Sequence, residues 1–245
     1  MIRRNSSHIR ALLFCAIGLF LACADDDTPS ATASLPELLT HAERRFHDGD
    51  LNSATASYRR ALHKDSTSTV AMVGLARVYE VRGRVDLADR YRRRAFHLNY
   101  RIGTAAREAG DGVAARIAFG VAASTMPNHP MAPLKIGEML LEAAQAESAL
   151  VYLEKAALAD PRFADARMKL GIALLQVGRT EEAQASFEAA IELNINAVDA
   201  YLNLGEIYAG RGEWAQAAAH YDRALLIRPT SELARQGLQA AMEHL

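Results

Sequence analysis

The chain has 245 residues, of which 50% are hydrophobic and 23% are charged, and its formal net charge is −1. This balance excludes any argument from overall charge for binding to nucleic acid or to an anionic membrane surface. The two cysteines, Cys15 and Cys23, both lie near the beginning of the chain, so residues 24–245 cannot form an internal disulfide. The apolar content is sufficient for a buried core, and the abundant alanine favours helices.

Residues 1–23 have the layout of a secretory signal. The segment begins with arginines, and an uncharged apolar run then extends from Ala11 to Ala22. A helix that spans a membrane needs about 20 apolar residues, and this run is shorter. We therefore expect the segment to direct export.

The end of this segment, Leu21-Ala22-Cys23, resembles the lipobox of bacterial lipoproteins. The resemblance implies that Cys23 carries a lipid, becomes the mature N-terminus and anchors the protein to a membrane. Phe20 stands where lipoproteins usually have leucine. This departure leaves open an ordinary cleavage near Ala22 or Ala24, which would release a soluble periplasmic protein.

The residues that follow Cys23 bear on location. Ala24 stands where enterobacterial lipoproteins of the inner membrane have aspartate, so the resemblance implies an outer-membrane lipoprotein that faces the periplasm. The acidic run 25–27 either resembles the surface-export signal of some lipoproteins or is a solvated linker. Small and polar residues continue to Leu35, and we expect 24–35 to be a flexible acidic and polar tether.

From residue 35 onward the sequence is repetitive. Pairs of a large and then a small residue recur at one constant interval, at Ile102-Gly103, Ile136-Gly137, Leu170-Gly171 and Leu204-Gly205. Small residues allow two helices to approach closely, and a large side chain of the neighbouring helix fills the remaining space. Each expected turn between helices has a small residue, at Gly49, Gly83, Gly110, Ala144, Gly178 and Gly212.

This pattern resembles tetratricopeptide repeats, whose period of about 34 residues is the interval between these pairs. The resemblance implies an all-α, right-handed superhelical α-solenoid of about six helix–turn–helix units within residues 35–231. A C-terminal capping helix is expected over 232–245, with Leu238 and Met242 facing inward. The units are predicted near 35–68, 69–101, 102–129, 130–163, 164–197 and 198–231.

Two units depart from the pattern. His41 and Arg45 replace apolar residues in the first, so its outer face is expected to be frayed or wet. The third unit is shortened: a helix over 86–98 is expected to end at Asn99-Tyr100, which leaves only about two turns of helix from Arg101. We expect a local change of superhelical twist near 99–110, as a hinge or as a simple irregularity.

No motif of catalytic chemistry, phosphate binding or zinc binding occurs in the sequence. His41 and His47 are close in sequence, but a spacing of six does not bring two side chains together on one helix face. Trp214 stands where the repeat requires a packed aromatic residue. We therefore predict no enzyme activity, no metal and no cofactor.

The resemblance to tetratricopeptide repeats implies a concave groove lined by the first helix of each unit, which binds a partner peptide or helix. Several residues at these positions are apolar although the hairpin core does not require them, and carboxylates flank them. The alternative is that they pack against an adjacent helix. The expected groove residues are Arg77, Met131, Leu134, Glu138, Leu141, Met168, Ile172, Leu175, Leu202 and Glu206.

These features predict a non-catalytic interaction scaffold of the bacterial cell envelope. It would bind protein partners, attach to the membrane through its lipid and assist the assembly of an envelope complex. Nucleic acid is not expected as a partner of an exported protein without interleaved aromatic and basic residues. Two alternatives remain, namely a soluble periplasmic carrier of a small or lipidic ligand and an enzyme with an unrecognised site.

Overall fold

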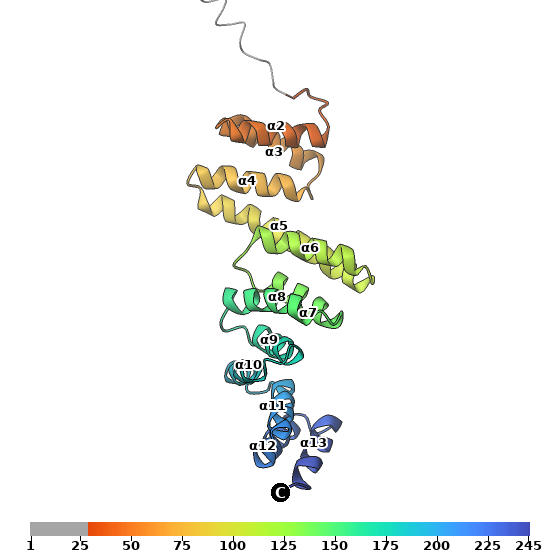
Figure 1. Cartoon of the computed structure of the whole chain (residues 1–245). Helices are drawn as coiled ribbons and strands as arrows, with labels where there is room; N and C mark the ends of the chain where they lie inside the picture. Colours follow the sequence, from red (N-terminus) through yellow and green to blue (C-terminus); the bar gives the residue numbers. More distant parts are fainter. Residues whose placement is uncertain (1–28) are drawn as a thin grey trace, which may run out of the picture. The chain divides into compact units, whose positions relative to one another are not determined.

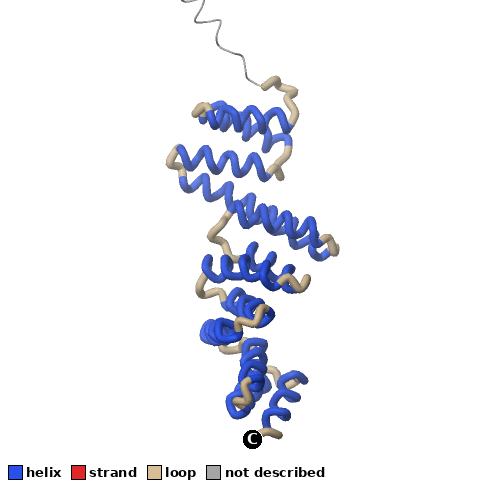
Figure 2. Tube along the Cα trace, viewed as in Figure 1, coloured by secondary structure: helices blue, strands red, loops and turns tan. Residues whose placement is uncertain are grey.

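The computed structural model describes residues 29–245, which form helices joined by short loops (Figure 2). Twelve helices and no strand occur in this range, which confirms the expected all-α fold. None of the described helices is both long and apolar enough to cross a membrane. The predicted signal, Cys23 and residues 24–28 of the predicted tether lie outside the described residues.

The helices divide into two compact units, one ending at Arg82 and one beginning at Gly83. The first contains α2 (Leu35–His47), α3 (Leu51–Lys64) and α4 (Thr69–Val81). The second contains α5 (Val85–Glu108), α6 (Gly112–Thr125), α7 (Met131–Glu142), α8 (Ala146–Ala159), α9 (Ala164–Gln176), α10 (Thr180–Leu193), α11 (Val198–Gly210), α12 (Trp214–Ile227) and α13 (Glu232–Met242).

Within each unit the helices pack mainly on their neighbours in sequence. In the second unit α5–α6, α7–α8, α9–α10 and α11–α12 form hairpins, and each hairpin also contacts the next one (Figure 1). In the first unit α2 and α3 form a hairpin, and α4 packs on α3. Contacts of this nearest-neighbour kind define an α-solenoid, in which every repeat is stabilised by the one beside it.

The large and small residues of the repeat meet inside each hairpin. A Cβ atom added to Gly171 would lie 2.6 Å from the Phe187 ring, and one added to Gly205 would lie 2.6 Å from the Tyr221 ring. Gly137 has the same relationship to Leu153. The second position of each pair is therefore small because a side chain of the partner helix occupies its space.

The turns inside the hairpins require a left-handed backbone. Gly178 has a φ of 78°, a conformation that glycine adopts without steric cost. At the equivalent place between α7 and α8 stands Ala144, with a φ of 56°. Its Cβ atom makes this conformation unfavourable, so the turn after α7 is strained where the turn after α9 is not.

The helix break expected at Asn99-Tyr100 does not exist. Helix α5 is continuous over 24 residues, from Val85 to Glu108 (Figure 1). The buried Asn99 side chain donates a hydrogen bond to the carbonyl of Ala95, 2.8 Å away, one turn earlier in the same helix. Its polar group is thus satisfied inside the helix, and no glycine or proline at this point interrupts the backbone. The expected boundary between units at 101/102 falls within α5.

The first hairpin is not wet at His41. The side chain of His41 is buried, and its Nδ1 atom lies 2.8 Å from the Ser57 hydroxyl on α3. The prediction of a frayed face is wrong at this position because a hydroxyl on the facing helix satisfies the imidazole. The segment just before α2 packs on the first hairpin, although it belongs to the predicted tether. Arg60 of α3 donates a hydrogen bond of 2.9 Å to the carbonyl of Pro29, and Ala33 is buried.

Helix α13 contacts both α11 and α12. Leu238 packs inward beside Ala241 and Tyr221, as expected, whereas Met242 is 64% exposed. The small Ala241 takes the inward position next to Met242, which turns the methionine to solvent and corrects the expectation that it faces inward. Trp214 stacks on His244 with ring centroids 4.1 Å apart, so it is packed as the repeat pattern predicts.

Candidate functional site

Helices α7, α9 and α11 place equivalent residues on one surface, once in each repeat. Met168, Ile172 and Leu175 of α9 are half-buried, and each contacts the core without being enclosed by it. Met131, Leu141 and Leu202 are also half-buried, and Glu206 is exposed. We call this surface of α7, α9 and α11 the A face.

Leu134 does not belong to the exposed part of the A face. Its side chain is 2% exposed and lies in the same buried cluster as Phe119, Ile136 and Leu153. The prediction of Leu134 as a groove residue is corrected, because its side chain contributes to the core between hairpins. The equivalent residue on α9, Met168, remains partly accessible.

Glu138 is the centre of an ion-pair network. Lys135 donates to its carboxylate at 2.8 Å, and Arg107 of α5 donates to the same oxygen at 3.2 Å. Arg107 also pairs with Glu142. Only 15% of the Glu138 side chain is exposed, so this carboxylate is enclosed and neutralised and does not form the free anionic edge that the sequence suggested.

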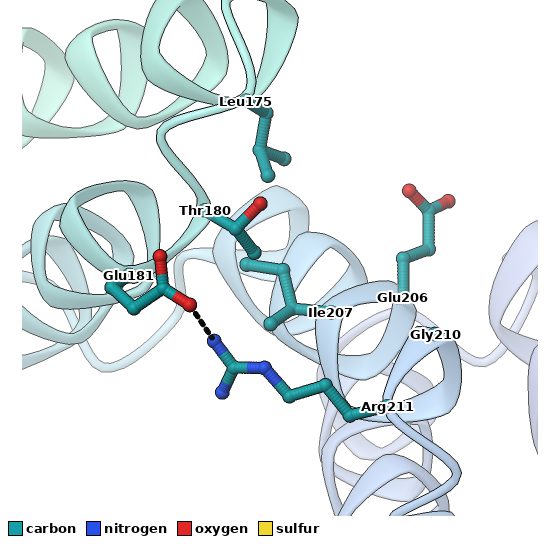
Figure 3. Close-up of a pocket in the computed structure, with 7 residues that line it drawn as sticks. All are labelled: Leu175, Thr180, Glu181, Glu206, Ile207, Gly210 and Arg211. Atoms are coloured by element: carbon teal, nitrogen blue, oxygen red, sulfur yellow. Dashed lines mark hydrogen bonds and ion pairs between the residues drawn. The ribbon is translucent and has the colours of Figure 1, made fainter.

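A first hollow of about 410 Å³ brings Leu175 and Glu206 together. It lies where the end of α9, the start of α10 and the last part of α11 meet. Leu175 and Thr180 project toward Ile207, and Glu206 points away from the ion pair of Arg211 and Glu181 (Figure 3). That ion pair has a distance of 3.4 Å, and among the described residues Glu206 has no ion pair or hydrogen-bond partner of its own.

A second hollow of about 360 Å³ contains Met168 and the edge of Glu138. Its other walls are mainly polar and come from α9, the loop after α10, the first turn of α11 and the residue that follows α12. Asp199 and Arg228 form an ion pair of 3.7 Å in this wall. The remaining polar lining residues are Asp165, Lys169, Asn194 and Asn196.

A third hollow, of about 440 Å³, lies between α5, α6 and α7, and none of the residues that line it is among the groove residues predicted from the sequence. Tyr100, Thr104 and Arg107 line it from α5. They stand one repeat period before Leu134, Glu138 and Leu141, so on α5 they take the places that these three residues take on α7. The repeat period alone could have indicated these three positions, but they were not considered because a helix break was expected at 99–100. Phe119, Lys135 and Glu108 complete the lining.

Arg77 lies in the first unit and is held by an internal ion pair. It donates to Glu43 at 2.6 Å, and its guanidinium lies 4.3 Å from the centre of the Phe46 ring. Tyr58 donates a hydrogen bond to the same carboxylate. Burial alone would raise the pKa of Glu43, but the hydrogen bonds from Tyr58 and Arg77 outweigh it and lower this pKa. Arg77 therefore links α4 to α2.

The described residues contain no group of three or more histidine, cysteine, aspartate or glutamate side chains that could hold a metal ion. His41 contacts Ser57, and His47 pairs with Glu43 at 3.4 Å, so the two histidines have different partners.

Two family models described as tetratricopeptide repeats match this sequence, one over residues 140–194 and one over residues 168–232. Residues 140–232 therefore carry tetratricopeptide repeats, a scaffold family that is typically non-catalytic. A search of curated proteins found no match.

Solved structures with the same fold include that of MamA. It is 28% identical to this chain, covers 61% of this chain and 81% of its own, and has a TM-score of 0.57. PilF of Pseudomonas aeruginosa is 18% identical, with 84% of this chain and 96% of its own covered and a TM-score of 0.52. The likeness to PilF concerns the fold alone.

Proposed function

We propose that this protein is a non-catalytic interaction scaffold that binds a peptide or helix of a partner protein on the A face. The observation that carries this proposal is the row of half-buried apolar side chains on α9. Met168, Ile172 and Leu175 contact the core but keep accessible surface along one side of the helix. Apolar side chains presented in this way gain further burial when an amphipathic segment covers them.

The two hollows beside this row support the same proposal. One lies at the end of α9 with Leu175 and the unpaired Glu206, and the other begins at Met168. An apolar strip with a depression at each edge suits a segment whose larger side chains enter the depressions. The unpaired carboxylate favours a basic residue in the partner near Glu206.

We further propose that the protein acts in the bacterial cell envelope, where it assists the assembly of a complex. Support comes from the export signal predicted in residues 1–23 and from Leu21-Ala22-Cys23, which resembles a lipobox. A lipid on Cys23 would anchor the scaffold to the outer membrane, facing the periplasm. Metabolic labelling with palmitate tests the anchor, because labelling should disappear in Cys23→Ser; undiminished labelling would assign the lipid elsewhere.

Binding on the A face is tested by affinity capture from envelope extracts after crosslinking. Leu175→Arg and Glu206→Arg should each lose a partner that the wild-type protein recovers reproducibly. The matched control is Leu158→Arg, because Leu158 lies on α8 and is 83% exposed. If both A-face variants recover the same partner as the wild type, the proposal is wrong.

A further inference from the structure

The third hollow suggests what kind of side chain the bound segment presents. We propose that the hollow between α5, α6 and α7 holds an aromatic side chain of the partner segment, which deepens the proposed function and rests on it. The hollow is formed by Tyr100, Thr104, Arg107, Glu108, Phe119 and Lys135.

The aromatic walls of this hollow are fixed before any ligand binds. Tyr100 meets Phe119 edge-on, with ring centroids 5.4 Å apart and an interplanar angle of 61°. On its other side Tyr100 stacks on Phe96 at 5.8 Å. Phe119 is 1% exposed overall and lies directly against Gly103. An incoming ring would meet the partly exposed Tyr100 ring with the buried Phe119 ring behind it, and aromatic rings favour edge-to-face and offset contacts with a further aromatic group.

Two cations stand beside these rings. Arg107 and Lys135 line the hollow, and Glu138 holds both of them. A cation over an aromatic face is attracted by the ring quadrupole, and this attraction is not available to an aliphatic side chain. Because the ion pairs already fix the positions of these cations, binding would not have to order them. This charge pattern selects an aromatic side chain over leucine or isoleucine.

The Tyr100 hydroxyl supplies a polar contact. No hydrogen bond joins it to any of the described residues. A tyrosine hydroxyl is protonated at neutral pH and can donate a hydrogen bond, and burial raises the pKa of Tyr100 further in the same direction. The backbone carbonyl of an extended or helical segment is the acceptor that every peptide carries.

The hollow also continues the A face. Tyr100, Thr104 and Arg107 repeat the places of Met168, Ile172 and Leu175 two periods earlier, and Arg107 contacts Glu138 of α7 directly. A segment that lies across α9 and α7 would therefore reach α5 at this hollow. Here the uninterrupted α5 presents aromatic and basic side chains in place of the aliphatic ones on α9.

Ligand-observed NMR with the full chain tests the inference with two probes, N-acetyl-tryptophanamide and N-acetyl-leucinamide. We expect the tryptophan probe to bind about two- to tenfold more tightly, because aromatic pairs contribute about 0.5–1.5 kcal/mol beyond burial. In a separate protein-observed titration, the Thr104 methyl signal should shift when the tryptophan probe is added. Equal affinity for the two probes, or no shift at Thr104, would overturn the inference.

Three variants test where the tryptophan probe binds. Thr104→Trp should fill the hollow and abolish binding of the tryptophan probe, whereas the exposed control variant Leu158→Arg on α8 should leave it unchanged. Lys135→Ala leaves the aromatic walls in place and should weaken the tryptophan probe severalfold without affecting the leucine probe. Unchanged binding in both Thr104→Trp and Lys135→Ala contradicts the inference.

The two proposals can fail separately. If the tryptophan probe does not bind the folded wild-type protein but partner capture depends on Leu175, only the inference of an aromatic side chain in the third hollow is contradicted. Capture that is insensitive to Leu175 and Glu206, together with binding of the probe, would instead remove the A face as the partner surface.

Discussion

The phenol ring of Tyr58 occupies the space that a side chain at Gly74 would need. A Cβ atom at Gly74 would overlap the ring atoms of Tyr58, and one at Gly237 would lie 2.5 Å from the Tyr221 ring. Both glycines follow their tyrosine by sixteen residues. Where the equivalent large residue is Phe119, Leu153 or Phe187, the residue sixteen positions later is Lys135, Lys169 or Asn203. Tyrosine at this place thus coincides with glycine on the next helix.

Replacing Gly237 by alanine should therefore destabilise the protein by about 1–3 kcal/mol, because the tyrosine ring cannot move away in a packed core. The measurement is the free energy of unfolding from urea denaturation. Gly120→Ala is the control, since this helical glycine has open space around its Cβ position. It should be neutral or stabilise the protein by up to about 1 kcal/mol. Combining Gly237→Ala with Tyr221→Leu should show coupling between the two sites; additive effects would contradict the contact.

Ala144→Gly should stabilise the protein by about 0.5–1 kcal/mol. The alanine has a φ of 56°, and glycine relieves this left-handed strain at the cost of a more flexible unfolded chain. The reverse change in the equivalent turn, Gly178→Ala, should destabilise by a similar amount, because φ there is 78°. Thermal melts of the two variants should shift in opposite directions.

Two histidines should make the protein less stable in mild acid. Burial lowers the pKa of His129, with a further contribution from His97, and burial also lowers the pKa of His220. Unfolding returns both to the ordinary value of 6.5, so the unfolded chain binds more protons below that pH. The stability contributed by the two uncharged histidines should be fully present above pH 6.5. It should be lost as the pH falls from there through the lowered pKa values of the folded protein.

A hydrogen bond to His129 is a second reason why stability should depend on pH. Its Nδ1 atom accepts a hydrogen bond of 3.4 Å from the Met131 amide at the start of α7, and a proton on that nitrogen removes the acceptor. Denaturation at pH 7.5 and at pH 5.5 should show a smaller pH effect in the double variant His129→Gln, His220→Gln than in the wild type. An equal pH effect in both proteins would assign the acid sensitivity to other groups.

Glu138→Ala should lower the free energy of unfolding by about 1–3 kcal/mol, whereas Glu142→Ala should lower it by less than about 1 kcal/mol. Removing Glu138 leaves Lys135 and Arg107 close together without the enclosed carboxylate between them. The Glu142 side chain is 61% exposed, so its pair with Arg107 is screened by water. Urea denaturation of both single variants gives the comparison. Equal losses of stability would contradict the prediction that the enclosed Glu138 carboxylate contributes more than the exposed Glu142 carboxylate.

Much of the solenoid could be predicted from the sequence because its helices follow a fixed period. The pairs that end in Gly137, Gly171 and Gly205 mark contacts that the structure reproduces. The break at 99–100 was wrong because Asn99 indicates a helix end in sequence, while in the structure its side chain bonds to the preceding turn. Local preference could not reveal this, since the bond depends on burial.

The candidate site was less predictable. The period gave the direction of each side chain on α7, α9 and α11, so Met168, Ile172 and Leu175 share one surface as expected. It could not give the depth of burial, which placed Leu134 in the core, nor the ion pairs that enclose Glu138 and hold Arg77. These features depend on neighbours that are distant in sequence, and for Glu138 the neighbour is Arg107 of α5.

The uninterrupted α5 also restricts how this array can change in length. Elsewhere a module of one repeat period could be duplicated or deleted at a loop, and the helices on either side would keep their phase. Within 85–108 no such loop exists, because the single helix α5 covers both the helix expected over 86–98 and the helix expected from Arg101. Insertion of a module there would have to divide the helix and separate Phe96 from Tyr100. Growth and shrinkage by whole modules are therefore confined to the regions before and after this helix, and the hollow beside Tyr100 would be kept as the rest of the array is rearranged.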